Sequence, residues 1–287
     1  MTFTGTIGKI CMFPLGAIIR VCVALRIHPN VLTTAGVLTN VAAAWALGLG
    51  AFVWGGVIMI VANIFDFIDG KVARELHEET RFGGFFDSVM DRFSDITLFI
   101  GLTYLYAEKG RTDYVIVTAL AMMFSVMTSY TRARAESLIT KCKVGFMERP
   151  ERIVLFMIGA FTNRMAAVIW VILVLSVFAV ADRIYYTWRE LSGGIRVEDE
   201  LQHRLAEIRL STPRSGAGGP GMTRVLTLPA LAVWRTFFWT YERATRQYDL
   251  WVIAILAFVW LTPPAWLHDP MAGGPGLIGW ILQTVSY

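Results

Sequence analysis

The sequence is poor in charged residues and in cysteine for its length. Only 17% of its 287 residues are charged, whereas 55% are hydrophobic. An ordinary water-soluble domain is excluded, because such domains carry about 25% charged residues. The three cysteines, Cys11, Cys22 and Cys142, have no metal-ligand spacing. A disulfide framework or a zinc site is therefore not supported, and we expect reduced structural thiols in a protein that belongs in a lipid bilayer.

Apolar stretches along the chain approach the roughly 20 residues that a membrane-spanning helix needs. They are 31–49, 52–67, 96–106, 114–128, 153–162 and 165–181. The fold class that we predict is therefore an all-α integral membrane protein with about six transmembrane helices. Basic residues gather in alternate connections, such as those containing Arg74 and Arg132. The positive-inside tendency places these connections in the cytoplasm, so we expect a multi-pass protein of the cell membrane.

The two ends of the chain differ from this core. Residues 1–26 carry Lys9 and Arg20 among apolar positions without a cleavage site, which predicts an interfacial amphipathic helix rather than a signal peptide. Residues 189–224 are polar and rich in Gly and Arg, as in a cytoplasmic linker. Residues 225–287 are apolar but interrupted, and predict either one or two further spans or interfacial helices. We therefore divide the chain into a membrane domain (1–188), this linker and a C-terminal extension of unknown role.

Four aspartates lie where one apolar stretch ends and the next begins. Asp66 and Asp69 are three residues apart and share a helix face, as do Asp87 and Asp91, which are four apart. A carboxylate in a membrane helix costs about 2.5–3.5 kcal/mol on insertion scales, so it normally faces a polar cavity. If the two helices form an antiparallel pair, the four acids converge and need cations. Oxygen ligands of this kind suit Mg²⁺ or Mn²⁺.

Small residues accompany these acids. Gly70, Ala73 and Gly83 would let a flat base or a pyrophosphate approach the helix backbone closely. Close packing between membrane helices is the alternative explanation. Beside four acids and Arg74, the pattern favours a pocket.

The whole pattern resembles the signature of the CDP-alcohol phosphatidyltransferases at every fixed position. It reads Asp66-x-x-Asp69-Gly70-x-x-Ala73-Arg74, then eight residues, then Gly83-x-x-x-Asp87-x-x-x-Asp91. The resemblance covers roughly residues 1–188. It implies a six-helix membrane domain, usually a homodimer, with a cavity open to the cytoplasm. The implied reaction transfers a phosphatidyl group from CDP-diacylglycerol to a small polar alcohol and releases CMP.

The resemblance also implies roles for individual residues. It places Asp66, Asp69, Asp87 and Asp91 at a site for two ions of Mg²⁺ or Mn²⁺. It also makes Asp91 the catalytic base. In contact with the CDP-lipid it places Asn30, Val31, Leu32, Thr33, Gly70, Ala73, Arg74, Thr80 and Gly83. Displacement at a pyrophosphate is helped when metal ions neutralise its oxygens and a base takes the proton of the incoming hydroxyl.

A second basic cluster bears on the acceptor alcohol. The runs 129–136 and 145–152 resemble the corresponding region of bacterial phosphatidylinositol-phosphate synthases, in which basic residues hold the phosphate of inositol phosphate. The matching positions are Arg132, Arg134, Arg152 and Arg183. Where those enzymes can have Lys, this chain has Arg132, which keeps the charge but alters the geometry. Arginines at a membrane edge also serve as interfacial anchors, and glycerol phosphate, free inositol and serine are alternative acceptors.

Other classes of function fit the pattern less well. Acids within a membrane also mark ion pathways, but a cation transporter would leave Gly70, Ala73 and Gly83 without a purpose at their spacings. All four acids are present, which disfavours a scaffold with a degenerate site. The expected partners are CDP-diacylglycerol, inositol phosphate or another small alcohol, the bilayer and a second copy of the chain, and no nucleic acid.

Overall fold

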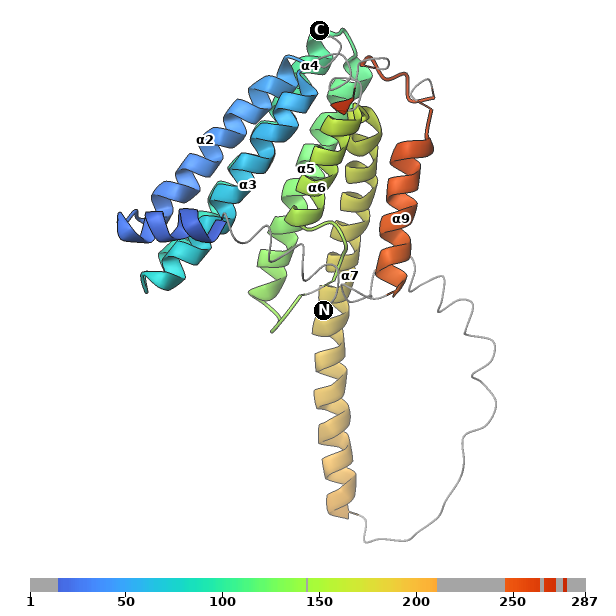
Figure 1. Ribbon diagram of the computed structural model, residues 1–287. Coiled ribbons are helices and arrows are strands. Elements are labelled where there is room, and N and C mark those ends of the chain that lie inside the picture. Colours follow the sequence, from blue (N-terminus) through green and yellow to red (C-terminus); the bar gives the residue numbers. More distant parts are fainter. Residues whose placement is uncertain (1–14, 143, 211–245, 264–265, 272–275, 278–287) are drawn as a thin grey trace, which may run out of the picture.

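The regular elements of the described chain are all helices. The computed structural model describes residues 15–142, 144–210, 246–263, 266–271 and 276–277 (Figure 1). A short helix, Leu15–Ala24, precedes the longer ones. These are α2 (Pro29–Gly48), α3 (Phe52–Glu75), α4 (Arg81–Glu108), α5 (Thr112–Glu136), α6 (Arg149–Thr162), α7 (Met165–Leu210) and α9 (Arg246–Leu261). The all-helical architecture predicted from the sequence is confirmed for these residues.

The six predicted apolar stretches fall in turn on α2 to α7, and only residue 49 lies beyond its helix, as the C-cap of α2. Within the described part of the chain, four helices are long and apolar enough to cross a membrane: α2, α3, α5 and the Met165–Ser192 part of α7. The helix α6 has 14 residues and is about 21 Å long, shorter than the hydrocarbon core of about 30 Å. The helix α4 is long enough but carries Asp87 and Asp91 in its first half and Asp95 at its middle. The count of six spans therefore stays a prediction.

Two helix starts at one end of the bundle are capped by side chains. The Nδ1 atom of His28 accepts a hydrogen bond from the backbone N–H of Asn30 at 3.2 Å at the start of α2. The hydroxyl of Thr80 accepts one from the backbone N–H of Gly83 at 2.9 Å at the start of α4. Such caps satisfy N–H groups that the helix itself leaves unpaired. They hold both helix starts beside the last turns of α3.

The helices pack in an order that brings α3 and α4 together at this end. The helix α2 packs along both α3 and α4, α5 lies against α4 and α7, and α6 contacts α3 and α7 (Figure 1). A Cβ atom at Gly101 of α4 would lie only 2.2 Å from the carbonyl oxygen of Ala44. Because only glycine fits there, α2 and α4 approach closely. In the core between α4 and α6, the rings of Phe99 and Phe156 pack edge to face, 5.0 Å between centroids.

The helix Leu15–Ala24 lies across the ends of α2 and α3 (Figure 1). Its Ile19 and Cys22 are buried in a small apolar cluster with Val72 of α3. The opposite face of the helix exposes Val21. Part of the predicted interfacial segment 1–26 is thus helical, residues 1–14 lie outside the described residues, and the location of this helix at a membrane surface stays a prediction.

The described part of the C-terminal extension packs against the helices of the membrane domain. The helix α9 packs against α7, with Ile255 and Val259 buried. Beyond α9, the chain is held at the end of the bundle where α7 begins. There Arg164 Nη1 donates to the Thr262 carbonyl at 2.6 Å, and Asn163 Nδ2 donates to the Met271 carbonyl at 2.9 Å.

The predicted linker 189–224 begins as helix. The helix α7 continues without a break to Leu210 and runs well past the other helices (Figure 1). The glycine- and proline-rich part of that linker, from 211 onward, lies outside the described residues, as do residues 225–245 of the extension.

Candidate active site

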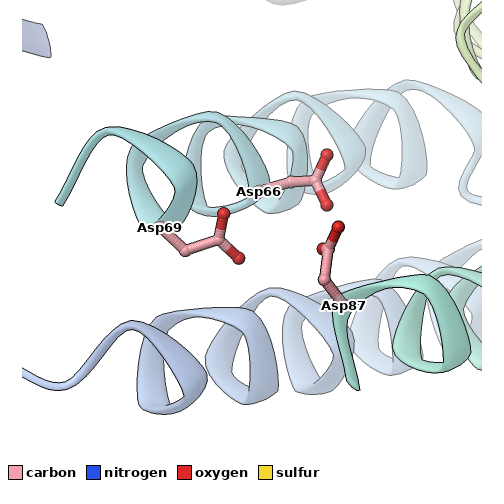
Figure 2. A group of neighbouring side chains, drawn as sticks. All are labelled: Asp66, Asp69 and Asp87. Atoms are coloured by element: carbon pink, nitrogen blue, oxygen red, sulfur yellow. The ribbon is translucent and has the colours of Figure 1, made fainter. Parts of the chain in front are cut away.

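Three of the four predicted acids meet at the turn between α3 and α4. Asp66 and Asp69 project from α3 toward Asp87 of α4 (Figure 2). Each offers a carboxylate oxygen, and these oxygens all lie within 4.8 Å of one another. Carboxylates so close repel one another unless a cation neutralises them. The donor set, oxygen only, fits a hard divalent cation. We refer to Asp66, Asp69 and Asp87 as the aspartate triad.

A threonine of α2 orients one member of the triad. The hydroxyl of Thr33 donates a hydrogen bond of 2.5 Å to Asp69 Oδ2. Both side chains are buried, so this bond ties α2 to α3 where water has little access. The predicted contact segment at the start of α2 is thereby linked directly to the acids.

The fourth acid, Asp91, is joined to the triad through an arginine. Arg149 Nη1 lies 3.0 Å from Asp91 Oδ1 and 2.9 Å from Asp66 Oδ2. Arg92 Nη1 lies 3.6 Å from the other oxygen of Asp91. Asp91 stands one helical turn beyond Asp87, so the two acids share a face of α4 but have different neighbours.

A cleft of about 360 Å³ opens beside the triad. Its wall includes seven of the nine residues predicted to contact the CDP-lipid: Asn30, Thr33, Gly70, Ala73, Arg74, Thr80 and Gly83. The remaining two are not in this wall, because Val31 is exposed and Leu32 is buried in the apolar cluster beneath it. Asp69 and Asp87 also line the cleft, which therefore connects directly to the triad.

Small residues and one cation shape this cleft. A Cβ atom at Gly83 would lie 3.1 Å from the Thr80 hydroxyl, so glycine preserves both the helix cap and the opening. Arg74 Nε donates to the Gly70 carbonyl at 2.7 Å, and its exposed guanidinium remains beside the cleft. With acids on one side and a guanidinium on the other, the cleft matches a metal-bound pyrophosphate.

Three of the four predicted acceptor arginines, Arg132, Arg152 and Arg183, gather around the start of α6. Arg152 Nη2 pairs with Asp95 Oδ2 at 2.6 Å. Its Nη1 donates to the Thr128 hydroxyl at 3.0 Å, while Arg183 Nη1 donates to the carbonyl of that same threonine. Arg152 and Arg183 are buried. They are therefore held rigidly by contacts within the protein.

The other two predicted arginines are more open to solvent. Arg132 Nη1 pairs with Glu148 Oε1 at 2.7 Å, and Arg183 Nη2 lies 3.9 Å from that oxygen. Arg132 thus joins the group, which we call the arginine cluster (Arg132, Arg152 and Arg183). Arg134 is exposed and donates to the Ser137 hydroxyl at 3.2 Å, so the structure does not bring it to the other three.

Two residues in this network were not assigned a role from the sequence. Asp95 lies four residues after Asp91, and Arg149 lies three residues before Arg152. Helical spacing places Asp95 on the same face as Asp91, and Arg149 on the same face as Arg152, which are both predicted site residues. That spacing is the signal that could have identified them.

The described cysteines take no part in the site. Cys22 and Cys142 are buried free thiols, and burial raises the pKa of the Cys142 thiol. A thiol that stays protonated is a poor nucleophile and metal ligand. Cys11 lies outside the described residues.

Comparison with known proteins agrees with this geometry. Residues 26–182 match the family described as CDP-alcohol phosphatidyltransferase. This chain belongs to that family. It is therefore a membrane phosphatidyltransferase, as the aspartate pattern predicted. The match ends before α9, so the C-terminal extension lies outside the matched region.

Two known proteins are similar to more than half of this chain. The archaetidylinositol phosphate synthase of Methanothermobacter thermautotrophicus is 36% identical over 173 residues, which are 58% of this chain and 86% of that protein. The phosphatidylinositol phosphate synthase of Mycobacteroides abscessus is 34% identical over 166 residues, which are 55% and 76% of the two chains.

Solved structures of phosphatidylinositol phosphate synthase from Mycobacterium tuberculosis are also similar. The structure with CDP-DAG bound has a TM-score of 0.57 and 30% identity, and the match covers 61% of this chain and 93% of that one. The structure in complex with manganese and citrate has a TM-score of 0.57 and 31% identity, with coverage of 61% and 88%. A manganese complex in a relative agrees with the metal-compatible triad found here.

Proposed function

We propose that this phosphatidyltransferase uses CDP-diacylglycerol as donor and the hydroxyl of inositol phosphate as acceptor, and releases CMP. The observation that carries the proposal is the placement of the aspartate triad between the cleft and the arginine cluster. The CDP-DAG-bound relative supports the donor. Inositol phosphate in the names of two relatives supports the acceptor.

The cleft is the proposed site for the CDP part of the donor. Gly70, Ala73 and Gly83 leave room for the nucleotide against the helix backbone. Arg74 donates charge-assisted hydrogen bonds to the pyrophosphate. The lipid chains then extend along the exposed apolar surfaces of the helices into the bilayer.

Divalent metal is the proposed cofactor, as Mg²⁺ or Mn²⁺ and with two ions in the complete site. Asp66, Asp69 and Asp87 fit one ion by their donor atoms and separation, and Asp91 is the proposed additional ligand. When bound, the metal neutralises pyrophosphate oxygens and the charge that develops on the leaving CMP.

Asp91 is the proposed base of the reaction. Its carboxylate takes the proton from the acceptor hydroxyl, whose oxygen forms a bond to the phosphorus of the phosphatidyl group. The bond from that phosphorus to the CMP oxygen breaks, and CMP leaves with the electron pair. Arg132, Arg152 and Arg183 hold the phosphate of the acceptor.

The membrane setting completes the proposal. Residues 1–188 form a six-span domain whose active site faces the cytoplasm from the cell membrane, and the first helix lies at the interface. Arg20 on an exposed side of that helix, and exposed apolar residues beside it, support this location. The working unit is a homodimer.

The acceptor is tested by measuring CMP release from purified protein with CDP-diacylglycerol and Mg²⁺ or Mn²⁺. The panel contains inositol phosphate, glycerol phosphate, free inositol and serine. We expect kcat/KM for inositol phosphate to exceed that for free inositol by at least about 100-fold, since charged hydrogen bonds contribute about 1.5–3 kcal/mol each. Arg132→Gln should raise the KM for inositol phosphate about tenfold and leave the KM for CDP-diacylglycerol unchanged.

Lys141→Gln is the matched control, because Lys141 is an exposed cation on the same side of the bundle. It should leave both KM values unchanged. Equal turnover with free inositol or serine would refute a phosphorylated acceptor and leave the family's broader reaction in place.

A further inference from the structure

Arg149 is the cation closest to the predicted metal ligands. Its Nη1 atom contacts two of the four motif acids, Asp66 at 2.9 Å and Asp91 at 3.0 Å. Its Nε atom lies 3.6 Å from a third carboxylate, that of Asp95. One guanidinium thus connects an acid of α3 with two acids of α4, although Arg149 itself lies at the start of α6.

These contacts engage the same carboxylates that a metal ion needs. Asp66 belongs both to the aspartate triad and to the pair with Arg149. A divalent ion bound by these same oxygens of Asp66 and Asp91 would lie within about 5 Å of Arg149 Nη1, because the oxygens are 2.9 and 3.0 Å from that nitrogen and about 2.1 Å from a bound ion. Like charges at this distance repel enough to change an equilibrium constant more than about tenfold in a partly hydrated site.

The position of Arg149 leaves one nitrogen of its guanidinium without a hydrogen bond in the described part of the chain. The Nε atom is buried and makes no hydrogen bond within the described residues. Its contact with Asp95 is longer than a hydrogen bond, and Asp95 is already paired with Arg152 at 2.6 Å. The Nε atom of Arg152 is likewise unpaired among these residues, but the rest of its guanidinium donates to that acid, to the Thr128 hydroxyl and to the Met147 carbonyl. Arg149 is therefore the less firmly held of the two arginines.

We propose that Arg149 is an internal counter-cation of the aspartate site, which competes with a divalent ion for Asp66 and Asp91. When the ion leaves, the guanidinium neutralises both acids and keeps α3 and α4 together. When the ion binds, Arg149 gives up these two carboxylates. The proposal rests on the metal-dependent function proposed above and adds a residue that sets how tightly the metal is held.

The test is a titration of purified protein with Mn²⁺ in the absence of substrates, followed by the electron paramagnetic resonance signal of free Mn²⁺. Arg149→Gln removes the charge and keeps a polar, shorter side chain. We expect its half-saturation concentration to fall about tenfold. In the presence of a chelator, the melting temperature of Arg149→Gln should be lower than that of the wild type. Addition of Mn²⁺ should raise the melting temperature of the variant by more than it raises that of the wild type.

Arg132→Gln is the control for charge, because Arg132 pairs with Glu136 and Glu148 rather than with the motif acids. Its half-saturation should stay within about twofold of the wild-type value, since an exposed, more distant charge is screened. Arg149→Lys keeps the cation and should restore wild-type affinity for Mn²⁺. A residue that only packs the bundle would lower the melting temperature equally with and without the metal.

Unchanged or weaker Mn²⁺ binding in Arg149→Gln would overturn the proposal, and weaker binding would make Arg149 a residue that orients the acids. The variant is purified with Mn²⁺ and stripped immediately before titration. A variant that stays unfolded even with Mn²⁺ would also contradict the proposal, because a site without its competitor should fold around the ion. No substrate is needed, so failure of the wild type to release CMP would refute the proposed function without affecting this result.

Discussion

Arginines lie at both ends of the helix bundle, and their partners differ. At the aspartate end, Arg149 and Arg152 pair with carboxylates. At the opposite end, Arg164 donates to the backbone carbonyls of Val259 and Thr262, and Arg111, which also pairs with its sequence neighbour Asp113, donates to that of His268. A carboxylate can exchange a guanidinium for a metal ion, whereas a backbone carbonyl beyond α9 belongs to the fold itself. The first set of contacts is suited to chemistry and the second to holding the C-terminal segment in place.

The largest effect expected at the aspartate end is on turnover. Asp91→Asn should lower turnover by about 10²–10⁴, the contribution of a positioned general base. Asparagine keeps the shape of the side chain, and Arg149 keeps its contacts with Asp66 and Asp95. The melting temperature should therefore stay close to the wild-type value. CMP release at saturating metal is the measurement, and turnover like that of the wild type would exclude Asp91 as the base.

A second substitution tests metal binding at the same end. Asp87→Asn removes one triad ligand and leaves the Thr33 bond to Asp69 and the Arg149 bond to Asp66 in place. A metal at 100 times its Kd stabilises a protein by about 2.7 kcal/mol, and we expect the variant to lose most of this gain in a thermal unfolding assay. Asp113→Asn is the control, because Asp113 pairs with Arg111 at the other end. Equal metal stabilisation of both variants would argue against ligation by Asp87.

The smallest effect on activity is expected at the C-terminal end. Arg164→Ala should lower the free energy of unfolding by about 1.5–3 kcal/mol, because it removes charged hydrogen bonds to the segment after α9. The KM values and the dependence on Mn²⁺ should not change. Lys109 is an exposed cation near the same end. The control Lys109→Ala should change neither the free energy of unfolding nor the KM values. A change of KM in Arg164→Ala without a loss of stability would break the distinction between the two ends.

The triad was predictable because it depends on short-range geometry. Helical periodicity sets which acids share a face, and the short connection between α3 and α4 brings the two faces together. The same geometry explains why two predicted cleft residues, Val31 and Leu32, lie elsewhere. Asn30 and Thr33 are three residues apart and share a face of α2, while the two residues between them point away from the cleft.

The role of Arg149 could not be predicted in this way. Its partner Asp66 is 83 positions away in the sequence, so their contact depends on how α6 packs against α3. The position of α9 had the same limitation, since Arg235 and the Pro263-Pro264 pair interrupt the apolar pattern of the extension. Its packing against α7 and the carbonyl contacts of Arg164 are tertiary features that no local pattern contains.

The helix α7 continues well beyond its own apolar part. Its apolar part ends at Ser192 and its backbone stays helical to Leu210. At about 1.5 Å per residue this continuation measures about 27 Å, close to the thickness of the hydrocarbon core itself. The helix therefore acts as a spacer on the side where the aspartate triad opens. Leu210, the last residue of this continuation, lies almost one hydrocarbon-core thickness along the helix beyond Ser192, where the apolar part ends.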